Sequence, residues 1–394
     1  MRTLSQPNDL IITCGRGAAP MLASELKQLG YTPRVVEDTA WAVIGSLGDA
    51  LRLNLWLRSA QRVLMPLHTF RARNADELYK GLVAQPWEDL LRPDGYFSIT
   101  TGVDMPGIRD PRFAALRTKD AIADRMTKMC GQRPDSGGDR NQTVFHLHWR
   151  NDEATICLDT SGEPLSRRGY RIQTGAAPMQ EGLAAACILA SPWRGESAFV
   201  NPMCGSGTLA IEAALIARNR APGLLRHNFG FMHVKGYREE DWKKLKRDAQ
   251  AGEYEHCKSA IIATDISPRA LGAAKANAER AHVAEDITFK VCDFAETPLP
   301  PPPGVIYFNP EYGERLGDPE NLEPTYRRIG DFLKQKCTGY FGYVFTANLP
   351  LSKRIGLHNK RRIILYNANL EGRLLEFELY TGTRDPGPLG AVEQ

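Results

Sequence analysis

Apolar segments of two kinds alternate along the second half of this chain. Short apolar runs, the pattern of buried strands, occupy residues 198–200, 260–265, 287–291, 305–308 and 340–345. Segments with helical spacing of apolar residues separate them, at residues 178–190, 208–217, 268–281 and 322–336. Two more runs, 361–366 and 374–380, are expected to end the sheet as an antiparallel pair. The alternation predicts a doubly wound α/β domain over residues 161–394.

The first part of the chain follows a different order, which predicts two small α+β units. Residues 1–55 show the sequence β-α-β-β: a strand at 10–14, a helix at 20–29, and a hairpin formed by 34–36 and 41–45. Residues 56–160 form the second unit. Its expected elements are a helix at 50–60, strands at 62–67 and 96–101, a helix at 113–129, and strands at 142–149 and 154–159. Residues 221–251 interrupt the α/β pattern and are expected to be a surface excursion.

Histidine and cysteine positions do not indicate a metal site. His146 and His148 alternate with apolar neighbours, so they are expected on the solvent face of a half-buried strand. The eight cysteines are scattered without a C-x-x-C pair, which predicts neither a disulfide framework nor a zinc site. We therefore expect no bound metal.

Composition and charge indicate the class of protein but do not distinguish between functions. At 394 residues, with 42% hydrophobic and 24% charged residues, the chain has the size and composition of a multidomain globular protein. No apolar stretch approaches membrane-spanning length, and the N-terminal residues lack the apolar core of a signal peptide, so we expect a cytoplasmic protein. The net charge is only +4, but arginines cluster locally, which suits a phosphate backbone or simply a solvated surface.

A glycine-containing loop follows the first predicted strand of the α/β domain. Its residues are Asn201, Pro202, Met203, Cys204, Gly205, Ser206, Gly207 and Thr208. Glycines let the backbone pass close to a ligand, and the free amides of the next helix can face a carboxylate. Asn201 and Cys204 either contact a cofactor or only shape the loop. The small size of Cys204 is the expected reason for its presence.

Acids end the next two predicted strands. Asp265 can accept both hydroxyls of a ribose, and Asp293 can accept from an adenine amine, with Phe294 or Ile266 against the ring. Helix capping is the plainer explanation for each acid. A nicotinamide dinucleotide fits poorly, because its ribose acid normally lies about 20 residues after the glycine loop. These positions favour S-adenosylmethionine.

A second loop, Asn309-Pro310-Glu311-Tyr312, follows the strand predicted at 305–308. The Asn309 side-chain oxygen and the Pro310 carbonyl can each accept one N–H of an exocyclic base amine, and Tyr312 offers a face for stacking. Alone, this loop could be an ordinary Asn-Pro turn. Both loops are expected at the carboxyl rim of one parallel sheet, where ligands bind. Together they predict methyl transfer to a nucleobase.

These motifs resemble the bacterial THUMP-domain methyltransferases that form N2-methylguanosine in 23S ribosomal RNA, the RlmL/YcbY-like family. The similar segments are 158–162, 167–171, 177–186, 201–209, 211–214 and 309–317. The resemblance implies a ferredoxin-like module at 1–55, a THUMP RNA-binding domain at 56–160 and a Rossmann-like methyltransferase domain at 161–394. It implies S-adenosylmethionine at residues 201–208 and Asp265, a catalytic role for residues 309–312, and structured RNA as partner, such as 23S ribosomal RNA or a ribosome assembly intermediate. Candidate RNA contacts are Arg167, Arg168, Arg171 and Arg315.

Two departures from that family bear on function. Glu311 stands where a second proline is usual, which changes the rigidity and charge of the loop. The sequence also ends at Gln394, without the second methyltransferase domain of some fused relatives, so one activity is expected.

Other functions stay open at this stage. The same amine geometry would serve guanine N2 in tRNA or adenine N6. Another possibility is an RNA-binding protein whose methyltransferase domain is impaired by Glu311. A nicotinamide oxidoreductase is disfavoured by the spacing of the acid.

Overall fold

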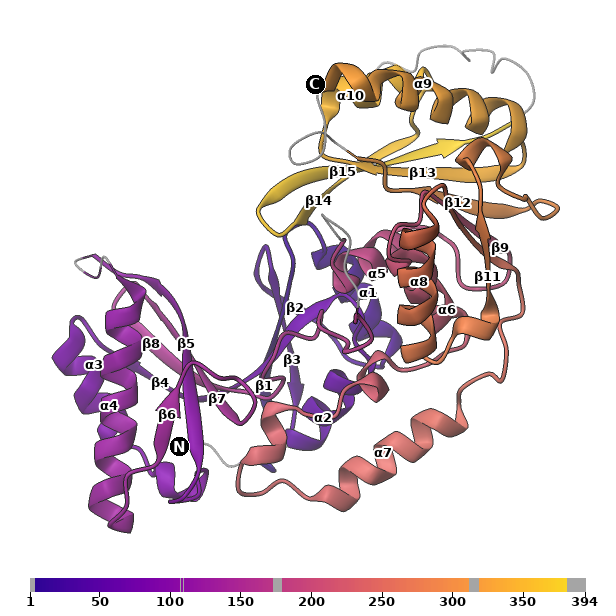
Figure 1. Cartoon of the computed structure of the whole chain (residues 1–394). Coiled ribbons are helices and arrows are strands. Elements are labelled where there is room, and N and C mark those ends of the chain that lie inside the picture. Colours follow the sequence, from indigo (N-terminus) through magenta and orange to yellow (C-terminus); the bar gives the residue numbers. More distant parts are fainter. Residues whose placement is uncertain (1–3, 107, 109, 173–178, 312–318, 381–394) are drawn as a thin grey trace.

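The computed structural model describes residues 4–106, 108, 110–172, 179–311 and 319–380, and the side chains of 319–321 are not described. These residues form two sheets with helices packed on them (Figure 1). The helices of the N-terminal half are α1 (Ala19–Gln28), α2 (Leu47–Trp56), α3 (Ala75–Val83) and α4 (Pro111–Cys130). Those of the C-terminal half are α5 (Glu181–Leu189), α6 (Thr208–Ala217), α7 (Glu239–Ala251), α8 (Pro268–Arg280), α9 (Pro319–Lys336) and α10 (Leu349–Ser352).

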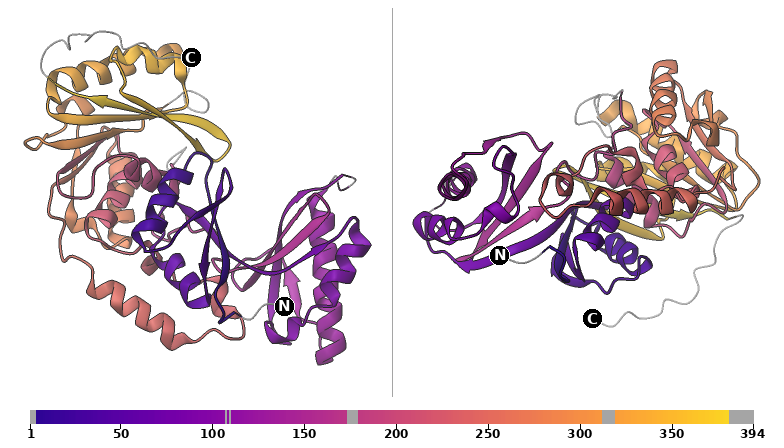
Figure 2. Two further views of the ribbon diagram at one scale, coloured as in Figure 1. Left: turned by 180° about the vertical axis from the view of Figure 1, so that it is seen from behind. Right: turned by 90° about the horizontal axis from the view of Figure 1, so that it is seen from below.

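The first sheet has eight strands in the order β2-β3-β1-β4-β8-β7-β5-β6. Their bounds are β1 (Asn8–Cys14), β2 (Arg34–Glu37), β3 (Ala40–Gly45), β4 (Ala60–Arg71), β5 (Tyr96–Asp104), β6 (Asp135–Gly137), β7 (Thr143–Arg150) and β8 (Glu153–Asp159). The N-terminal half of β4 pairs with β1, whereas most of β4 pairs with β8. One long strand therefore belongs to both predicted α+β units, and Figure 2 shows the two lobes that it joins.

The second sheet has seven strands in the order β11-β10-β9-β12-β13-β15-β14. Their bounds are β9 (Ala198–Pro202), β10 (Ile261–Asp265), β11 (Ile287–Val291), β12 (Gly304–Phe308), β13 (Tyr340–Thr346), β14 (Arg361–Asn367) and β15 (Leu370–Glu378). The first five strands in this spatial order are parallel, and β15 is antiparallel to both β13 and β14. The predicted doubly wound α/β domain and its terminal antiparallel pair are confirmed.

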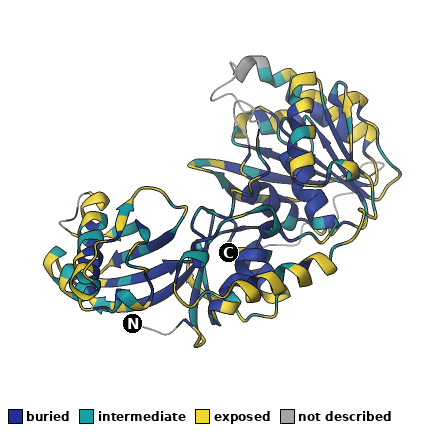
Figure 3. Cartoon of the chain, turned by 60° about the horizontal axis from the view of Figure 1, so that its bottom comes forward, coloured by how far each residue is buried: buried dark blue, intermediate teal, exposed yellow. Residues whose placement is uncertain are grey.

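Helices cover both faces of the second sheet. On one face, Phe199 and Tyr307 belong to the large apolar cluster that also contains α5, α6 and α8. On the other face, Val200 and Phe308 pack with α9 residues such as Phe332 in a separate cluster. Figure 3 shows the strands buried in dark blue and the outer helix faces exposed in yellow. The sheet rims are therefore the places where this domain can receive a ligand.

Two predictions about local structure are wrong. The helix expected at 50–60 ends at Trp56, and strand β4 already begins at Ala60. The segment 221–251 is more than a surface excursion, because Phe229, Phe231 and Trp242 are almost fully buried and pack on one another. Among the described residues, no helix combines the length and apolar character needed to cross a membrane.

Candidate functional site

The two predicted loops lie at the same rim of the second sheet. Strands β9 and β12 are parallel neighbours, with Val200 opposite Ile306, so the residues that follow both strands emerge side by side. The Asn201 side-chain nitrogen donates to the Tyr307 carbonyl at 2.9 Å and ties the two strand ends together. The prediction that the loops share one rim is confirmed.

Backbone hydrogen bonds and a close helix contact shape the glycine loop. The Cys204 amide donates to the Thr264 carbonyl of the neighbouring strand at 2.9 Å, and the Gly207 amide donates back to Cys204 at 2.9 Å. Gly207 has φ = 81°, and a Cβ there would lie 2.9 Å from the Ala274 Cβ on α8. A side chain at 207 would thus be strained and crowded, whereas a Cβ at Gly205 would meet nothing within 4 Å. The backbone at Gly205 is open to a ligand.

Asp265, the last residue of β10, is held in place by two backbone amides. Its Oδ2 accepts from the Gly205 amide at 2.9 Å, and its Oδ1 accepts from the Ser267 amide at 2.9 Å. Each carboxylate oxygen can accept a further hydrogen bond. Next to it, Ile266 leaves 71% of its surface exposed. A carboxylate and an apolar face are therefore presented together at the rim.

Asp293 and Phe294 are engaged by helix α9 instead of facing this rim freely. Asp293 caps a short turn through the Ala295 amide and pairs with Arg328 at 2.7 Å. Burial acts to raise the pKa of Asp293, but the hydrogen bonds from Arg328 and Ala295 outweigh it and hold the pKa below its usual value. Phe294 is 6% exposed, packs edge-on against Phe308, and carries Arg328 over its ring at 4.7 Å. Of the two apolar side chains considered for a cofactor ring, Ile266 is the exposed one.

The second loop contains a buried acceptor without a partner. The Asn309 Oδ1 is buried and makes no hydrogen bond, and Pro310 is buried beside it. The Oδ1 of Asn201, which is 1% exposed, is also without a partner. A buried polar atom in this state costs about 1–3 kcal/mol unless a bound group satisfies it. Two such oxygens at one rim fit a site for a hydrogen-bond donor.

The remaining residues of this loop are only partly described. Glu311 is exposed, and its carbonyl accepts from the Tyr326 hydroxyl at 3.1 Å. Tyr312 and Arg315, a candidate catalytic residue and a candidate RNA contact, lie outside the described residues.

Two of the arginines proposed to bind RNA are in the wrong place for that role. Arg168 is 1% exposed and donates to the Leu165 and Arg58 carbonyls, with Glu212 at 3.5 Å. Its partners lie inside the protein, so it is a structural residue. Arg167, by contrast, is 75% exposed and pairs with Glu163 at 2.7 Å, so RNA could reach its side chain.

Arg171 contacts the glycine loop, and its guanidinium is not presented on a surface for RNA. Its guanidinium donates to Thr208 Oγ1 at 3.1 Å and lies 3.4 Å from Ser206 Oγ. The same group pairs with Glu181 at 3.1 Å and donates to the Met179 carbonyl at 2.7 Å. Arg171 therefore places a positive charge at the first turn of α6.

Sequence reasoning missed two residues that position the loops. Asn277, 1% exposed on α8, donates to the Ser206 carbonyl at 3.1 Å and accepts from the Ile172 amide at 2.9 Å. The available signal was a polar residue on the apolar face of an alanine-rich helix. Tyr326, from α9, holds the Glu311 carbonyl as described above.

Neither thiol nor metal chemistry is indicated at this rim. Burial raises the pKa of Cys204 far above its usual value, so the thiol stays protonated and is a poor nucleophile. Within the described ranges, histidine, cysteine and acidic side chains form no group of three that could hold a metal ion.

Three family models match this chain in succession. They are the RlmL ferredoxin-like domain at residues 9–64, the THUMP domain at residues 72–159, and the RMKL-like methyltransferase domain at residues 168–376. The last covers more than half of the chain, and the chain belongs to the RMKL-like methyltransferase family. The predicted resemblance is confirmed.

Individual relatives agree with this assignment. Ribosomal RNA large subunit methyltransferase K/L of Syntrophotalea carbinolica is 39% identical over 95% of this chain and 54% of its own length. The crystal structure of SMU.472, complexed with SAH, is 27% identical, covers 96% of this chain and all of that one, and has a TM-score of 0.86. A predicted N6-adenine-specific DNA methylase from Listeria monocytogenes is 31% identical over 95% of this chain and 97% of that one, with a TM-score of 0.84. This chain spans about half the length of the curated K/L relatives that it matches.

Proposed function

We propose that this chain transfers a methyl group from S-adenosylmethionine to the N2 amine of guanine in structured RNA, with 23S ribosomal RNA as substrate. The observation that carries the proposal is the buried, unpartnered Asn309 Oδ1 at the same rim as the glycine loop and Asp265. The names of the K/L relatives and the THUMP match support RNA as the substrate. Residues 56–160 would contribute RNA binding, and the cytoplasm is the proposed compartment.

The residues at the rim fit an adenosyl cofactor. The free lone pairs of Asp265 would accept the two ribose hydroxyls, and Ile266 would cover one face of the adenine. Arg171 and the first amides of α6 would attract the amino-acid carboxylate. The complex of SMU.472 with SAH, the product left after methyl donation, supports this assignment. When bound, S-adenosylmethionine supplies a methyl group on a positively charged sulfur.

The second loop would prepare the amine for attack. Asn309 Oδ1 and the Pro310 carbonyl would each accept one N–H, which fixes the nitrogen and directs its lone pair at the methyl carbon. Formation of the carbon–nitrogen bond would break the carbon–sulfur bond and leave S-adenosylhomocysteine, and the amine would release one proton to water. Glu311 is exposed and could also take this proton. Tyr312 would stack on the extruded base.

The test is methyl incorporation with separate measurement of cofactor binding. Purified protein, S-adenosylmethionine and unmodified 23S ribosomal RNA should give N2-methylguanosine, identified by nucleoside mass spectrometry. Asn309→Ala should lower transfer by a factor of at least about 100 while S-adenosylhomocysteine affinity changes less than about threefold, because Asn309 acts on the base. Wild-type transfer by Asn309→Ala would contradict the amine clamp.

Adenine N6 is a second candidate, since the Listeria relative is named for that activity and the loop geometry suits either amine. The same digest distinguishes the products, because N6-methyladenosine and N2-methylguanosine differ in mass. Cofactor binding without incorporation into 23S ribosomal RNA, tRNA or DNA would favour an RNA-binding protein with an impaired site.

A further inference from the structure

The segment 221–251 leaves the methyltransferase domain between α6 and β10 and contacts both N-terminal units (Figure 1). Its aromatic residues Phe229, Phe231 and Trp242 pack into one buried group, in which the two phenylalanine rings stack and Trp242 meets both edge-on. The segment returns to its own domain through Glu253, which pairs with Arg218 at 2.8 Å and Arg220 at 2.7 Å. It is therefore a folded element anchored at both ends.

Arg226 binds the stretch of chain that follows the last THUMP strand. Its guanidinium donates to the carbonyls of Pro164 at 2.8 Å, Ser161 at 3.0 Å and Glu163 at 3.0 Å. Burial lowers the pKa of Arg226 to about 10, so the group remains charged at neutral pH. Three charge-assisted hydrogen bonds hold the turn at residues 161–164 firmly.

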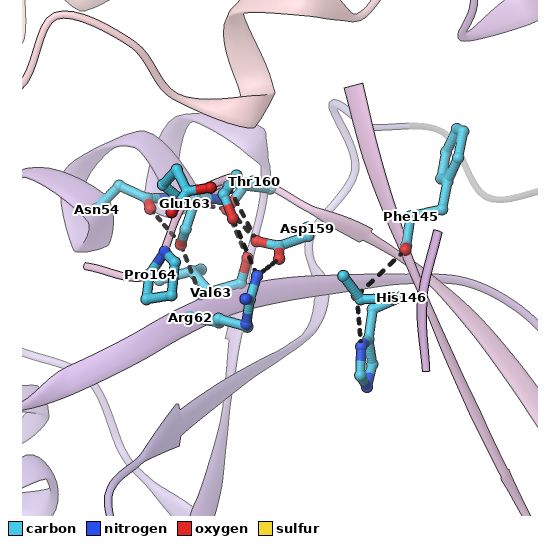
Figure 4. Close-up of polar contacts among 12 residues, drawn as sticks. Asn54, Arg62, Val63, Phe145, His146, Asp159, Thr160, Glu163 and Pro164 are labelled. Carbon is cyan, nitrogen blue, oxygen red and sulfur yellow. Dashed lines mark hydrogen bonds and ion pairs between the residues drawn. The ribbon is translucent and has the colours of Figure 1, made fainter. Parts of the chain in front are cut away.

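The same turn is fixed from the other side by the N-terminal units. Figure 4 shows Arg62 paired with Asp159, and Asn54 reaching Thr160. Asp159 and Thr160 are fully buried. The Phe231 amide donates to the Thr160 carbonyl at 3.0 Å, so the insertion and the N-terminal helix α2 meet on the same residue.

Further contacts join the insertion to the body of each unit. On the THUMP side, Asn228 donates to the Asn141 carbonyl at 2.7 Å, and the Lys235 amide donates to the Leu90 carbonyl at 2.8 Å. On the ferredoxin-like side, a Cβ at Gly223 would lie only 2.7 Å from the Leu55 Cα. Contacts this close leave little room for one unit to rotate against the other.

We propose that Arg226 and Phe231 make the segment 221–251 a specificity-determining brace. It holds the RNA-binding unit at one distance and angle from the methyl-transfer rim, so that only a base at a matching distance from the bound RNA structure reaches Asn309. The inference rests on the proposed function. It extends that function from the choice of the reacting base to the distance between this base and the RNA structure that the RNA-binding unit holds. Fixed spacing raises the effective concentration of one base and excludes others.

The connection to the rim supports this role. Residues 165–171 run from the braced turn to the glycine loop and bury Leu165, Arg168 and Tyr170. The Tyr170 hydroxyl donates to Glu212 of α6 at 3.1 Å, one turn beyond Thr208. These contacts keep the turn at a fixed distance from α6 and its loop.

The decisive variant is Arg226→Ala, with Arg238→Ala as the matched control. Arg238 lies in the same segment, but its side chain is 75% exposed. With 23S ribosomal RNA, Arg226→Ala should lower kcat/KM at the principal guanine at least about tenfold and increase the share of methyl groups at other guanines, while S-adenosylhomocysteine affinity stays within about twofold. Arg238→Ala should match wild type. An unchanged rate and site distribution for Arg226→Ala, or a loss that parallels cofactor affinity, would overturn the brace.

A measurement without RNA separates failure of the brace from failure of the proposed function. Small-angle X-ray scattering should give a compact wild-type protein and a larger radius of gyration for Arg226→Ala. If that variant does not fold, Arg226→Lys should show the same changes to a smaller extent, because lysine keeps the charge but not the planar fork. Identical scattering of a folded variant and wild type would overturn the brace. A wild-type protein that methylates no RNA would refute the proposed function and leave the scattering result to decide the brace.

Discussion

Replacing Asp265 by alanine is the sharpest perturbation of the proposed cofactor site. Asp265 already accepts one backbone amide on each oxygen, from Gly205 and Ser267, both at 2.9 Å. Each oxygen retains capacity for one ribose hydroxyl. A hydrogen bond to a charged acceptor contributes about 1.5–3 kcal/mol, so the loss of two predicts at least about 3 kcal/mol, or about 100-fold in Kd.

The assay is calorimetric titration with S-adenosylhomocysteine, which binds without reacting. Gly205 is not fully buried, so water can satisfy its amide in the variant and the fold should survive. Thermal melting checks this point. Asp331→Ala, which removes an exposed carboxylate from α9, should bind like wild type. A folded Asp265→Ala protein whose affinity lies within about threefold of wild type would refute the assignment of Asp265 to the ribose.

Substitutions at Arg168, His146 and Arg171 test other parts of the molecule. Arg168→Met should lower the free energy of unfolding by about 3–5 kcal/mol in urea titrations, because it removes the guanidinium beside the buried Glu212 carboxylate and its hydrogen bonds to two backbone carbonyls. Arg167→Ala should change that free energy by less than about 0.5 kcal/mol, and equal effects would contradict the burial argument. Burial and the charge of Arg62 lower the pKa of His146 from 6.5 to about 4. Between these two pH values the unfolded chain therefore binds more protons than the folded chain. The free energy of unfolding should fall by up to about 3 kcal/mol as the pH drops from 6.5 to 4. His146→Gln should flatten that dependence, and an equally steep profile would exclude His146 as its source. Arg171→Met should weaken the binding of S-adenosylhomocysteine about tenfold. It should weaken the binding of methylthioadenosine, which lacks the amino-acid part, by less than about threefold. Equal losses of affinity for both ligands in calorimetry would argue against a role of Arg171 in binding the carboxylate.

Features that depend on local sequence could be predicted. Strand runs, helical spacing and the glycine loop are all properties of neighbouring residues. The order of the strands after residue 178 and of helices α5, α6, α8 and α9 therefore followed from pattern alone, whereas α7 did not. The shared rim of the two loops followed as well, because parallel strands with helical crossovers bring their carboxyl ends to one edge. Asp265 at the end of β10 is the residue for which this reasoning was most specific.

Features that depend on distant partners could not be predicted. Arg167 and Arg168 are adjacent and identical in type, yet Arg168 is buried because Glu212 on α6 lies against it. Phe294 follows an acid near a strand end, a position that favours ring stacking, but helix α9 covers it. In both cases the deciding contact comes from an element that packs from elsewhere in the chain, and no local pattern contains it.

The long strand β4 has a consequence for how the N-terminal half holds together. Its twelve residues pair with β1 at one end and with β8 along most of their length, so the ferredoxin-like and THUMP units share a single hydrogen-bonded spine. If the strands of one unit unfolded, the part of β4 that pairs with them would become an open strand edge of the other unit. We therefore expect the ferredoxin-like and THUMP units to unfold together, and a truncation between them should yield two unstable fragments.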